Sequence, residues 1–359
     1  MEYLLSIEGR SPWGWALAPL IPLASLYGLV MRARSALYAH GLLRRQTLPC
    51  RVISIGNLTV GGTGKTPVVI ALATALRDRG RRVGVVSRGY KRRSVDPLME
   101  VSDGQVVRGH PSETGDEPFL IAQRCPGVPV AVGADRPLVG RHLIDRYGVD
   151  TLILDDGYQH LALQRNVNIL VLDAGAPFGN GYLLPRGRLR EPLASIARAS
   201  AVLVTRASQT GYLDEIKSVV RAEAPAVPIW VTDFAPSAVT RVGGSATVEP
   251  SVLKGERVLA LSGIGHPGSF QRLLVAAGAT VTDHCVFPDH HAYSQEDVLS
   301  VQRTAERLGV DRIVTTEKDA VKLAELEKAQ GGQGMIWAVR IDLIWLEGLE
   351  EWTRVVLQG

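Results

Sequence analysis

A glycine-rich stretch that ends in a lysine and a threonine has the residue types that bind phosphate groups. The stretch runs from Gly61 to Thr66 and reads Gly-Gly-Thr-Gly-Lys-Thr. Glycines allow successive backbone N–H groups to close around phosphate oxygens. Lys65 can reach the β- and γ-phosphates of a nucleotide, and the Thr66 hydroxyl can ligate Mg²⁺. We therefore predict a phosphate-binding loop formed by Gly61, Gly62, Thr63, Gly64, Lys65 and Thr66.

The sequence on either side of this loop has the pattern that a phosphate-binding loop needs. The β-branched run from Val52 to Ile55 predicts a buried strand before the loop. An apolar helical pattern from Pro67 to Leu76 follows it, and a helix N-terminus favours anions. Thr59 is a departure, because these loops usually have a glycine at that position. The flanking strand and helix favour a phosphate-binding loop over the alternative, a glycine-rich turn with a chance lysine.

Two acidic motifs could assist chemistry on a bound nucleotide. Asp155 and Asp156 end an apolar run, the place where a second motif of phosphate-loop enzymes holds Mg²⁺. A pair of turn-forming aspartates is the alternative, and we favour the metal site. Asp116 lies in the sequence Gly-Asp-Glu-Pro before an apolar helical run. Composition alone favours a helix cap and first turn there over a general base for a hydroxyl nucleophile.

Other polar clusters follow predicted strands or lie in loops. Arg88 comes directly after a strand, and the loop 180–192 contains three arginines that suit an anionic group or a solvated surface. His290 and His291 follow Asp289 directly. Adjacent loop histidines do not usually bind one ion, and the sequence offers no third ligand. A metal site at these histidines is therefore the weaker interpretation.

Alternating strand and helix patterns predict an α/β fold with a parallel sheet covered on both faces. Ligands of such sheets gather at the carboxyl ends of the strands, where the polar clusters lie. We expect a P-loop NTPase-like domain at residues 49–234, a linker at 235–255 and a smaller α/β domain at 256–359, after a membrane-associated helical segment at 1–48. Strands are predicted at 51–55, 82–87, 128–132, 151–154, 167–172, 201–205, 257–261, 280–286, 312–314 and 335–339, and helices at 67–79, 118–124, 135–147, 269–277, 295–308 and 319–328.

Composition limits the class of protein. The chain has 359 residues, of which 46% are hydrophobic and 21% charged, so it can bury a large core and is not disordered. The net charge of +4 fits an anionic substrate or membrane surface. No stripe combines basic and aromatic residues, which argues against nucleic acid as a partner. The distant cysteines Cys50, Cys125 and Cys285 match neither a zinc spacing nor a disulfide framework, and indicate a reducing compartment.

The N-terminal segment carries no charged residue from Ser11 to Met31, a length close to the ~20 residues that span a bilayer. Trp13 and Trp15 lie at one end, where interfacial aromatic residues belong, and arginines follow the other end. Pro19 and Pro22 weaken a straight spanning helix, although both could lie near a helix start. We predict an interfacial or shallowly inserted helix. The alternative is a helix packed on the globular body.

Taken together, the motifs resemble those of the tetraacyldisaccharide 4′-kinase family, the lipid A 4′-kinases of Gram-negative bacteria. Besides the phosphate-binding loop they are Ser87-Arg88-Gly89-Tyr90, Gly115-Asp116-Glu117-Pro118, Asp155-Asp156-Gly157-Tyr158-Gln159-His160, Leu189-Arg190-Glu191-Pro192, Phe287-Pro288-Asp289-His290 and Thr315-Thr316-Glu317-Lys318-Asp319. Each motif alone is weak, but the set in this order is specific and covers nearly the whole chain. The resemblance implies transfer of phosphate from ATP, with Mg²⁺, to the 4′-hydroxyl of a membrane-embedded, tetraacylated glucosamine disaccharide 1-phosphate. The product would be lipid IVA, made at the cytoplasmic face of the bacterial inner membrane.

The resemblance also implies roles for individual residues. Asp116 falls on the general base proposed for the family, which raises that role above the helix cap. His290 falls on a histidine that orients or tunes this base from the second domain. The ATP triphosphate and Mg²⁺ would be held by Lys65, Thr66, Asp155 and Asp156, with Lys65 also catalytic. Substrate contacts are implied for Arg88, Glu117, Gln159, His160, Arg190 and Glu191.

A switch ATPase of the partitioning or metal-insertion kind is the competing class. Such proteins share Gly-Gly-x-Gly-Lys-Thr but usually have a lysine just before the glycine pair, where this chain has Val60. A membrane-anchored adaptor, the third class, leaves the acidic clusters unexplained. ATP hydrolysis measured with and without lipid disaccharide would separate the three classes.

Overall fold

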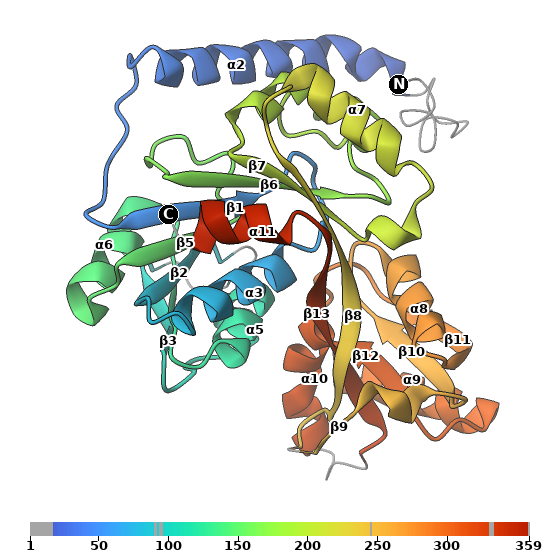
Figure 1. The fold of residues 1–359 in the computed structure, drawn as a ribbon. Coiled ribbons are helices and arrows are strands. Elements are labelled where there is room, and N and C mark those ends of the chain that lie inside the picture. Colours follow the sequence, from blue (N-terminus) through green and yellow to red (C-terminus); the bar gives the residue numbers. More distant parts are fainter. Residues whose placement is uncertain (1–16, 90–91, 93–95, 245, 330–333, 358–359) are drawn as a thin grey trace.

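One continuous sheet organises the molecule (Figure 1). The computed structural model describes residues 17–89, 92, 96–244, 246–329 and 334–357, and within these residues the sheet has 13 strands. They are β1 (Arg51–Gly56), β2 (Val83–Ser87), β3 (Met99–Asp103), β4 (Pro129–Val132), β5 (Thr151–Asp155), β6 (Val167–Asp173), β7 (Ala201–Thr205), β8 (Ile229–Arg241), β9 (Thr247–Val248), β10 (Arg257–Ser262), β11 (Thr280–Val286), β12 (Ile313–Thr316) and β13 (Ile336–Glu347). Their order across the sheet is β11-β10-β12-β13-β8-β7-β6-β1-β5-β2-β4-β3, with β9 paired to β8.

Helices connect most of these strands. They are α2 (Ile21–Ala39), α3 (Lys65–Arg77), α4 (Pro111–Thr114), α5 (Asp116–Arg124), α6 (Arg136–Tyr147), α7 (Leu213–Glu223), α8 (Pro267–Ala276), α9 (Gln295–Leu308), α10 (Glu317–Ala329) and α11 (Leu349–Trp352). We call β1–β7 with α3–α7 the N-terminal half, and β10–β12 with α8–α10 the C-terminal half. In both halves the central strand pairs are parallel, for example β1 with β5 and β6, and β10 with β11 and β12.

The two faces of the N-terminal half are covered by different helices. Ile53 and Ile153 point to the face that α3 and α5 cover, whereas Val52 and Leu152 belong to the cluster that α6 covers. Successive side chains of a strand point to opposite faces, so a run of buried apolar residues in β1 and β5 serves both layers. The predicted P-loop NTPase-like α/β fold, with its sheet covered on both faces, is confirmed.

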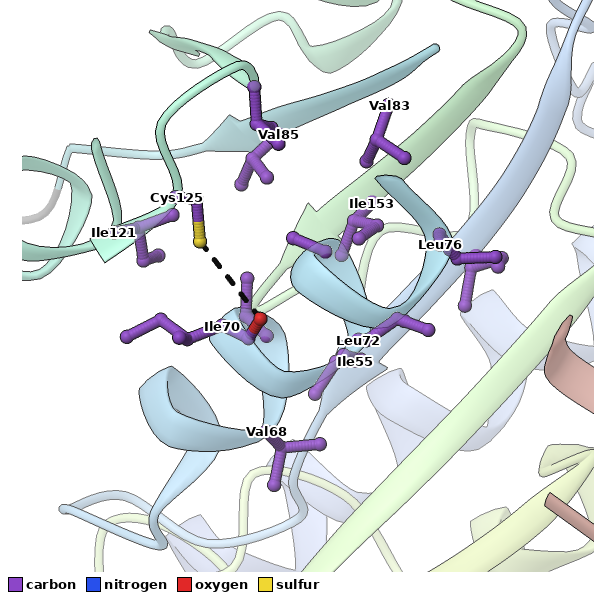
Figure 2. Packing of buried hydrophobic residues seen from close by; sticks show 14 of the residues in the cluster. Ile55, Val68, Ile70, Leu72, Leu76, Val83, Val85, Ile121, Cys125 and Ile153 are labelled. Atoms are coloured by element: carbon purple, nitrogen blue, oxygen red, sulfur yellow. Dashed lines mark hydrogen bonds between the residues drawn. The ribbon is translucent and has the colours of Figure 1, made fainter. Parts of the chain in front are cut away.

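Helix α3 fixes the phosphate-binding loop against the sheet. Its buried residues Val68, Ile70, Leu72 and Leu76 pack on strand residues such as Ile153 (Figure 2). The helix begins at Lys65, so Lys65 and Thr66 form its first turn directly after the loop. Because the apolar face of α3 is fully buried, the position of this turn relative to the sheet is rigidly set.

The long strands β8 and β13 join the two halves. They pair antiparallel from Trp337 opposite Arg241 to Glu347 opposite Val231, and so run through both halves (Figure 1). Strands β3 and β8 and helix α7 were not predicted from the sequence, and the last strand extends to Glu347 rather than ending at residue 339. Most residues of β8 and β13 that lie outside the core are only half-buried or exposed. The strand conformation of β8 and β13 therefore depends on their pairing with each other rather than on a local apolar pattern.

The C-terminal end of the chain returns to the N-terminal half. Trp352 of α11 is buried and packs edge-on against Trp230 at 5.3 Å between ring centroids. The Arg51 guanidinium donates to the backbone carbonyls of Val355 and Val356. The sheet is continuous, and residues from both predicted domains share one core. The division into domains at 49–234 and 256–359 stays a prediction.

Helix α2 lies on the N-terminal half by one narrow face. Ala24 and Gly28 are buried, and a Cβ on Gly28 would come within 2.6 Å of Leu183. Around the rest of its surface and at its start, the helix exposes apolar side chains: Ile21, Leu23, Leu26, Leu29 and Val30. In the described part of the chain, no helix has the length and hydropathy to cross a membrane. Pro22 lies in the first turn of α2, as expected, whereas Trp13, Trp15 and Tyr90 lie outside the described residues.

Candidate active site

A cavity of about 900 Å³ lies where the two halves meet. Its floor is the phosphate-binding loop, and one wall comes from the start of α5. The opposite wall comes from the loop between β11 and α9 and from the start of α10. Tyr27 and Met31 of α2 also line it. Among the residues it brings together are Lys65, Asp116, Asp155, Asp156, His290 and Lys318.

The phosphate-binding loop has the backbone shape that its glycines predict. Gly61 and Gly64 both have positive φ, at 115° and 77°, a region that residues with a Cβ rarely adopt. The Lys65 ammonium lies 3.1 Å from Asn57 Oδ1 and 3.4 Å from Asp156 Oδ1. A glycine loop of the C-terminal half touches the phosphate-binding loop, since a Cβ on Gly265 would lie 3.1 Å from the Gly62 nitrogen. The two halves therefore meet directly at the predicted phosphate site.

The two aspartates at the end of β5 have different environments. Asp155 is buried and accepts a hydrogen bond from Ser87 Oγ at 2.9 Å. Burial, together with the negative charges of Glu117 and Asp156, raises the pKa of Asp155 to about 7. Asp156 has a positive φ of 53° and an ion pair with Arg190 at 2.8 Å. Burial opposes its ionisation, but the charges of Lys65 and Arg190 outweigh burial and lower the pKa of Asp156 to about 2.

Asp155 fits a divalent cation better than Asp156 does. Within the described residues, its Oδ1 atom is buried without a hydrogen-bond partner, and such an atom needs a partner in a folded protein. Asp156 is already paired with two cations. The described residues include no cluster of three His, Cys, Asp or Glu side chains that could hold a metal. Mg²⁺ does not need one, since it binds through one or two carboxylates together with substrate phosphates and water.

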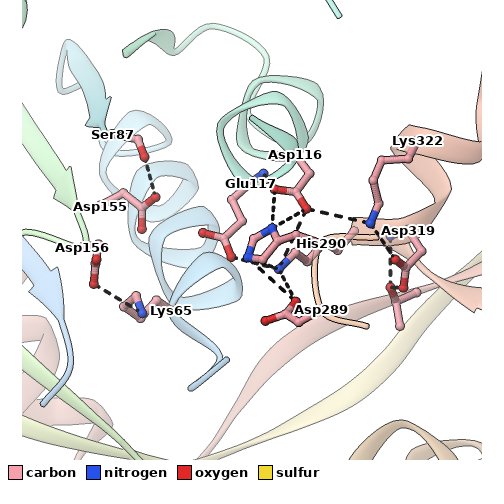
Figure 3. Close-up of polar contacts among 12 residues, drawn as sticks. Lys65, Ser87, Asp116, Glu117, Asp155, Asp156, Asp289, His290, Asp319 and Lys322 are labelled. Atoms are coloured by element: carbon pink, nitrogen blue, oxygen red, sulfur yellow. Dashed lines mark hydrogen bonds and ion pairs between the residues drawn. The ribbon is translucent and has the colours of Figure 1, made fainter. Parts of the chain in front are cut away.

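Asp116 and His290 form a hydrogen-bonded pair across the cavity (Figure 3). His290 Nδ1 lies 2.9 Å from Asp116 Oδ2 and 3.1 Å from Oδ1. Burial alone would raise the pKa of Asp116, but the hydrogen bond from His290 and the charges of Lys318 and Lys322 lower it to about 2. Asp116 is thus an ionised carboxylate in a buried site, the form that a proton acceptor requires.

The neighbouring histidine has a different partner. His291 Nε2 lies 3.1 Å from Asp297 Oδ2, whereas His290 is directed to Asp116. The two histidines therefore point to different carboxylates and do not converge on one point.

Lys318 was not predicted as a site residue, although it belongs to the motif Thr315-Thr316-Glu317-Lys318-Asp319. Lys318 lies in the first turn of α10, directly after β12. Its Nζ atom lies 3.2 Å from Glu117 and 3.1 Å from Asp289. The signal that could have found it is its place at the carboxyl end of a strand, the rule that identified the acidic pair.

A second ion pair, next to Lys318 in the chain, also joins helices α5 and α10. Arg124, at the end of α5, binds Glu317 at 2.6 Å and Asp342 at 2.6 Å. Burial raises the pKa of Glu317, against the charge of Arg124. The adjacent positions Glu317 and Lys318 of α10 thus both contact α5, one through Arg124 and the other through Glu117.

Most residues predicted to bind substrate line the cavity. These are Arg88, Glu117, Gln159, His160 and Arg190. Gln159 donates to the Asn57 carbonyl at 3.0 Å, which braces the start of the phosphate-binding loop. Burial and the charges of nearby arginines lower the pKa of His160 to about 4, so it is neutral at pH 7. Substrate contact stays a prediction for each of these residues.

Glu191 is placed differently from the other five. It is 2% exposed, does not line the cavity, and forms an ion pair with Arg198 at 2.7 Å. Its neighbour Arg190 points to Asp156 instead. Glu191 therefore anchors the arginine-rich loop to the segment before β7, while Arg190 reaches the cavity.

Comparisons with known proteins agree with each other. The family described as tetraacyldisaccharide-1-P 4′-kinase matches residues 16–358. A protein named tetraacyldisaccharide 4′-kinase from Syntrophus aciditrophicus (strain SB) is 44% identical over 332 residues, which cover 89% of this chain and 87% of the relative. One of the same name from Anaeromyxobacter sp. (strain Fw109-5) is 43% identical over 348 residues, covering 94% and 92%. A crystal structure of LpxK from Aquifex aeolicus in complex with ATP has 31% identity and a TM-score of 0.75, covering 96% of this chain and 99% of that one.

Proposed function

This chain belongs to the tetraacyldisaccharide-1-P 4′-kinase family, and we infer from its site how it carries out the reaction of that family. It is an ATP-dependent kinase that phosphorylates the 4′-hydroxyl of tetraacyldisaccharide 1-phosphate, which gives the lipid A precursor lipid IVA. The observation that carries this function is the presence of Lys65 and the Asp116–His290 pair in one cavity. The phosphate-binding loop alone would fit a switch ATPase equally well, whereas a carboxylate paired with a histidine beside it also fits phosphate transfer to a hydroxyl.

The geometry divides the chemistry between the floor and the walls of the cavity. A sugar hydroxyl is a poor nucleophile until a base accepts its proton, and the ionised Asp116 carboxylate can do so. Lys65 can neutralise negative charge on the transferred phosphoryl group. His290 comes from the other half of the molecule, so the base has its partner only while the halves are in contact. Contact between the halves also excludes water, which limits wasteful hydrolysis of ATP.

We further propose Mg²⁺ as the cofactor, held by Asp155 together with Thr66. The buried, unpartnered Oδ1 of Asp155 and the position of Thr66 in the first turn of α3 support this assignment. Mg²⁺ would supply Lewis-acid stabilisation of the triphosphate. Asp156 acts differently under this proposal, because it holds Lys65 and Arg190 in place.

We also propose that the protein works on the cytoplasmic face of the bacterial inner membrane, with α2 in the interface. Its exposed apolar side chains Ile21, Leu23, Leu26, Leu29 and Val30 support this location, since an exposed apolar helix surface partitions into the headgroup–acyl boundary. Tyr27 and Met31 of the same helix line the cavity. A lipid substrate could therefore reach the phosphate-binding loop without leaving the membrane surface.

Transfer of radiolabel from the γ-position of ATP to tetraacyldisaccharide 1-phosphate tests the function. We expect a labelled lipid product that requires the disaccharide, together with slow ATP hydrolysis in its absence. Lys65→Ala is the matched control for contaminating kinases. Rapid hydrolysis of ATP without any labelled lipid would instead support the switch ATPase.

A further inference from the structure

We propose that Lys318 is a positioning residue that sets the protonation state of the Asp116–His290 pair, with Asp116 ionised and His290 neutral and protonated on Nδ1. The proposal rests on the proposed function, because the pair is the proton-accepting unit of the kinase. It assigns a role to a lysine of α10 that the function itself does not require.

The contacts of Lys318 are those of a bridge between the halves. Its ammonium lies 3.2 Å from Glu117 Oε1 and 3.9 Å from Asp116 Oδ2, both on α5. It also lies 3.1 Å from Asp289 Oδ1 and 3.3 Å from His290 Nε2, in the loop between β11 and α9. The side chain is only 16% exposed, so these interactions are weakly screened by solvent.

The contact with His290 decides the tautomer of the imidazole. A lysine ammonium has three donors and no acceptor. The three carboxylates outweigh the effect of burial and raise the pKa of Lys318, so it stays an ammonium. His290 Nε2 must then accept the hydrogen bond from Lys318, and the proton of a neutral imidazole must lie on Nδ1. That Nδ1–H points to Asp116 at 2.9 Å.

The charges around Asp116 explain why this lysine is needed. On its own helix Asp116 faces Glu117, and from the loop before α9 it faces His290 with Asp289 beside it. From α10 it faces Lys318 and Lys322, each at 3.9 Å. Lys322 is engaged mainly by Asp319 at 2.9 Å. Lys318 is therefore the cation that offsets the three clustered carboxylates in the described part of the site.

Removing Lys318 should change the histidine as well as the aspartate. The Lys318 ammonium at 3.3 Å holds Nε2 as an acceptor. Without the lysine, the proton of His290 would no longer be confined to Nδ1. Asp116 would then lose the fixed Nδ1–H donor that orients it. The expected cost is a kcat lower by about tenfold or more, with the KM for ATP little changed, because general bases contribute ~10²–10⁴-fold.

Nitrogen-15 NMR of histidine-labelled protein tests this directly, with His290→Ala to assign the signals. In the wild-type protein at pH 7.5 we expect a protonated Nδ1 and an unprotonated Nε2 for His290. Lys318→Met should show protonation of Nε2, whereas Lys318→Arg should keep the wild-type pattern because it retains a cationic donor. Lys322→Met is the matched control, since it removes a cation equally far from Asp116 but engaged mainly by Asp319, and should leave the His290 pattern unchanged.

Kinase activity of the same proteins supplies a second readout. The proposal is overturned if wild-type His290 is an imidazolium or carries its proton on Nε2. It is also overturned if Lys318→Met keeps the wild-type His290 signals, even when its activity is lost. Failure of the wild-type protein to phosphorylate the lipid would refute the proposed function instead, so the two failures are distinguishable. Thermal melts and ATP binding confirm that each variant is folded.

Discussion

His290 and Asp116 lie within 2.9 Å of each other although 174 positions separate them in the chain. Asp116 begins α5 in the N-terminal half, and His290 follows β11 at the far edge of the sheet in the C-terminal half. The positive φ of His290, at 63°, turns its side chain toward the cavity. A backbone conformation that is uncommon outside glycine thus occurs at a residue whose placement matters for the reaction.

Asp116→Ala and His290→Ala should each lower kcat by about 10²-fold or more with little change in ATP affinity. If the two residues act as one unit, the loss in the double variant should be much less than the product of the single losses. Steady-state kinetics of the four proteins measure this coupling. Fully multiplicative losses would show independent action and would leave the kinase assignment intact.

Lys65→Ala should abolish transfer, with a loss of about 10²-fold or more, because it removes the charge that stabilises the developing phosphoryl negative charge. It also removes one of the two cations that hold Asp156. Single-turnover transfer at saturating ATP would measure the chemical step. Near-normal turnover would rule out the phosphate-binding role of this loop.

Asp155 should make stability depend on pH in the absence of Mg²⁺. Its pKa of about 7 in the folded protein is above its ordinary value of 3.8, so between these values the folded state binds more protons than the unfolded state. Stability from this group therefore falls as pH rises through that window. The lowered pKa values of Asp116 and Asp156 affect stability only at acidic pH, below their ordinary values.

Asp155→Asn is the variant that isolates this effect. His160, whose pKa is lowered to about 4, acts in the opposite direction between pH 4 and 6.5, but it is common to both proteins. In EDTA, the melting temperature of wild type relative to Asp155→Asn should fall between pH 5 and pH 8. An unchanged difference over that range would show that Asp155 is ionised throughout.

Exposed leucines of α2 should contribute to membrane binding without contributing to folding. Leu26 and Leu29 are 58% and 61% exposed, and each buried leucine is worth about 1.5–3 kcal/mol of transfer free energy. Leu26→Ser with Leu29→Ser should weaken sedimentation with anionic lipid vesicles and leave the melting temperature unchanged. Leu138→Ser, at an exposed leucine of α6, is the matched control. Equal vesicle binding by all three proteins would contradict an interfacial α2.

Leu72→Ala should destabilise the protein by about 2–5 kcal/mol, the usual cost of a cavity in a core. Leu72 is fully buried between α3 and the sheet. Denaturant unfolding should show a lower midpoint, and the KM for ATP should rise because α3 carries the phosphate-binding loop. A wild-type midpoint would mean that this core can collapse around the missing side chain.

The sequence by itself determined the elements whose signals are local. The loop from Gly61 to Thr66, the strand before it and α3 after it are adjacent in the chain, so the spacing of residue types was enough to predict them. Asp155 was found for the same reason, since it ends an apolar strand in a fold that gathers ligands at strand ends. The motifs in order also indicated the family, which the comparisons confirm.

Only the tertiary structure decided which distant groups share a site. Lys318 contacts Glu117 across 201 positions, and no local pattern encodes that contact. Glu191 and Arg190 are neighbours with the same local signal, yet one is buried against Arg198 and the other reaches Asp156. Long-range strand pairing of β8 with β13 joins the two halves, and so brings Lys318 to Glu117. Such pairing depends on the packing of the whole sheet rather than on the residues within any one window.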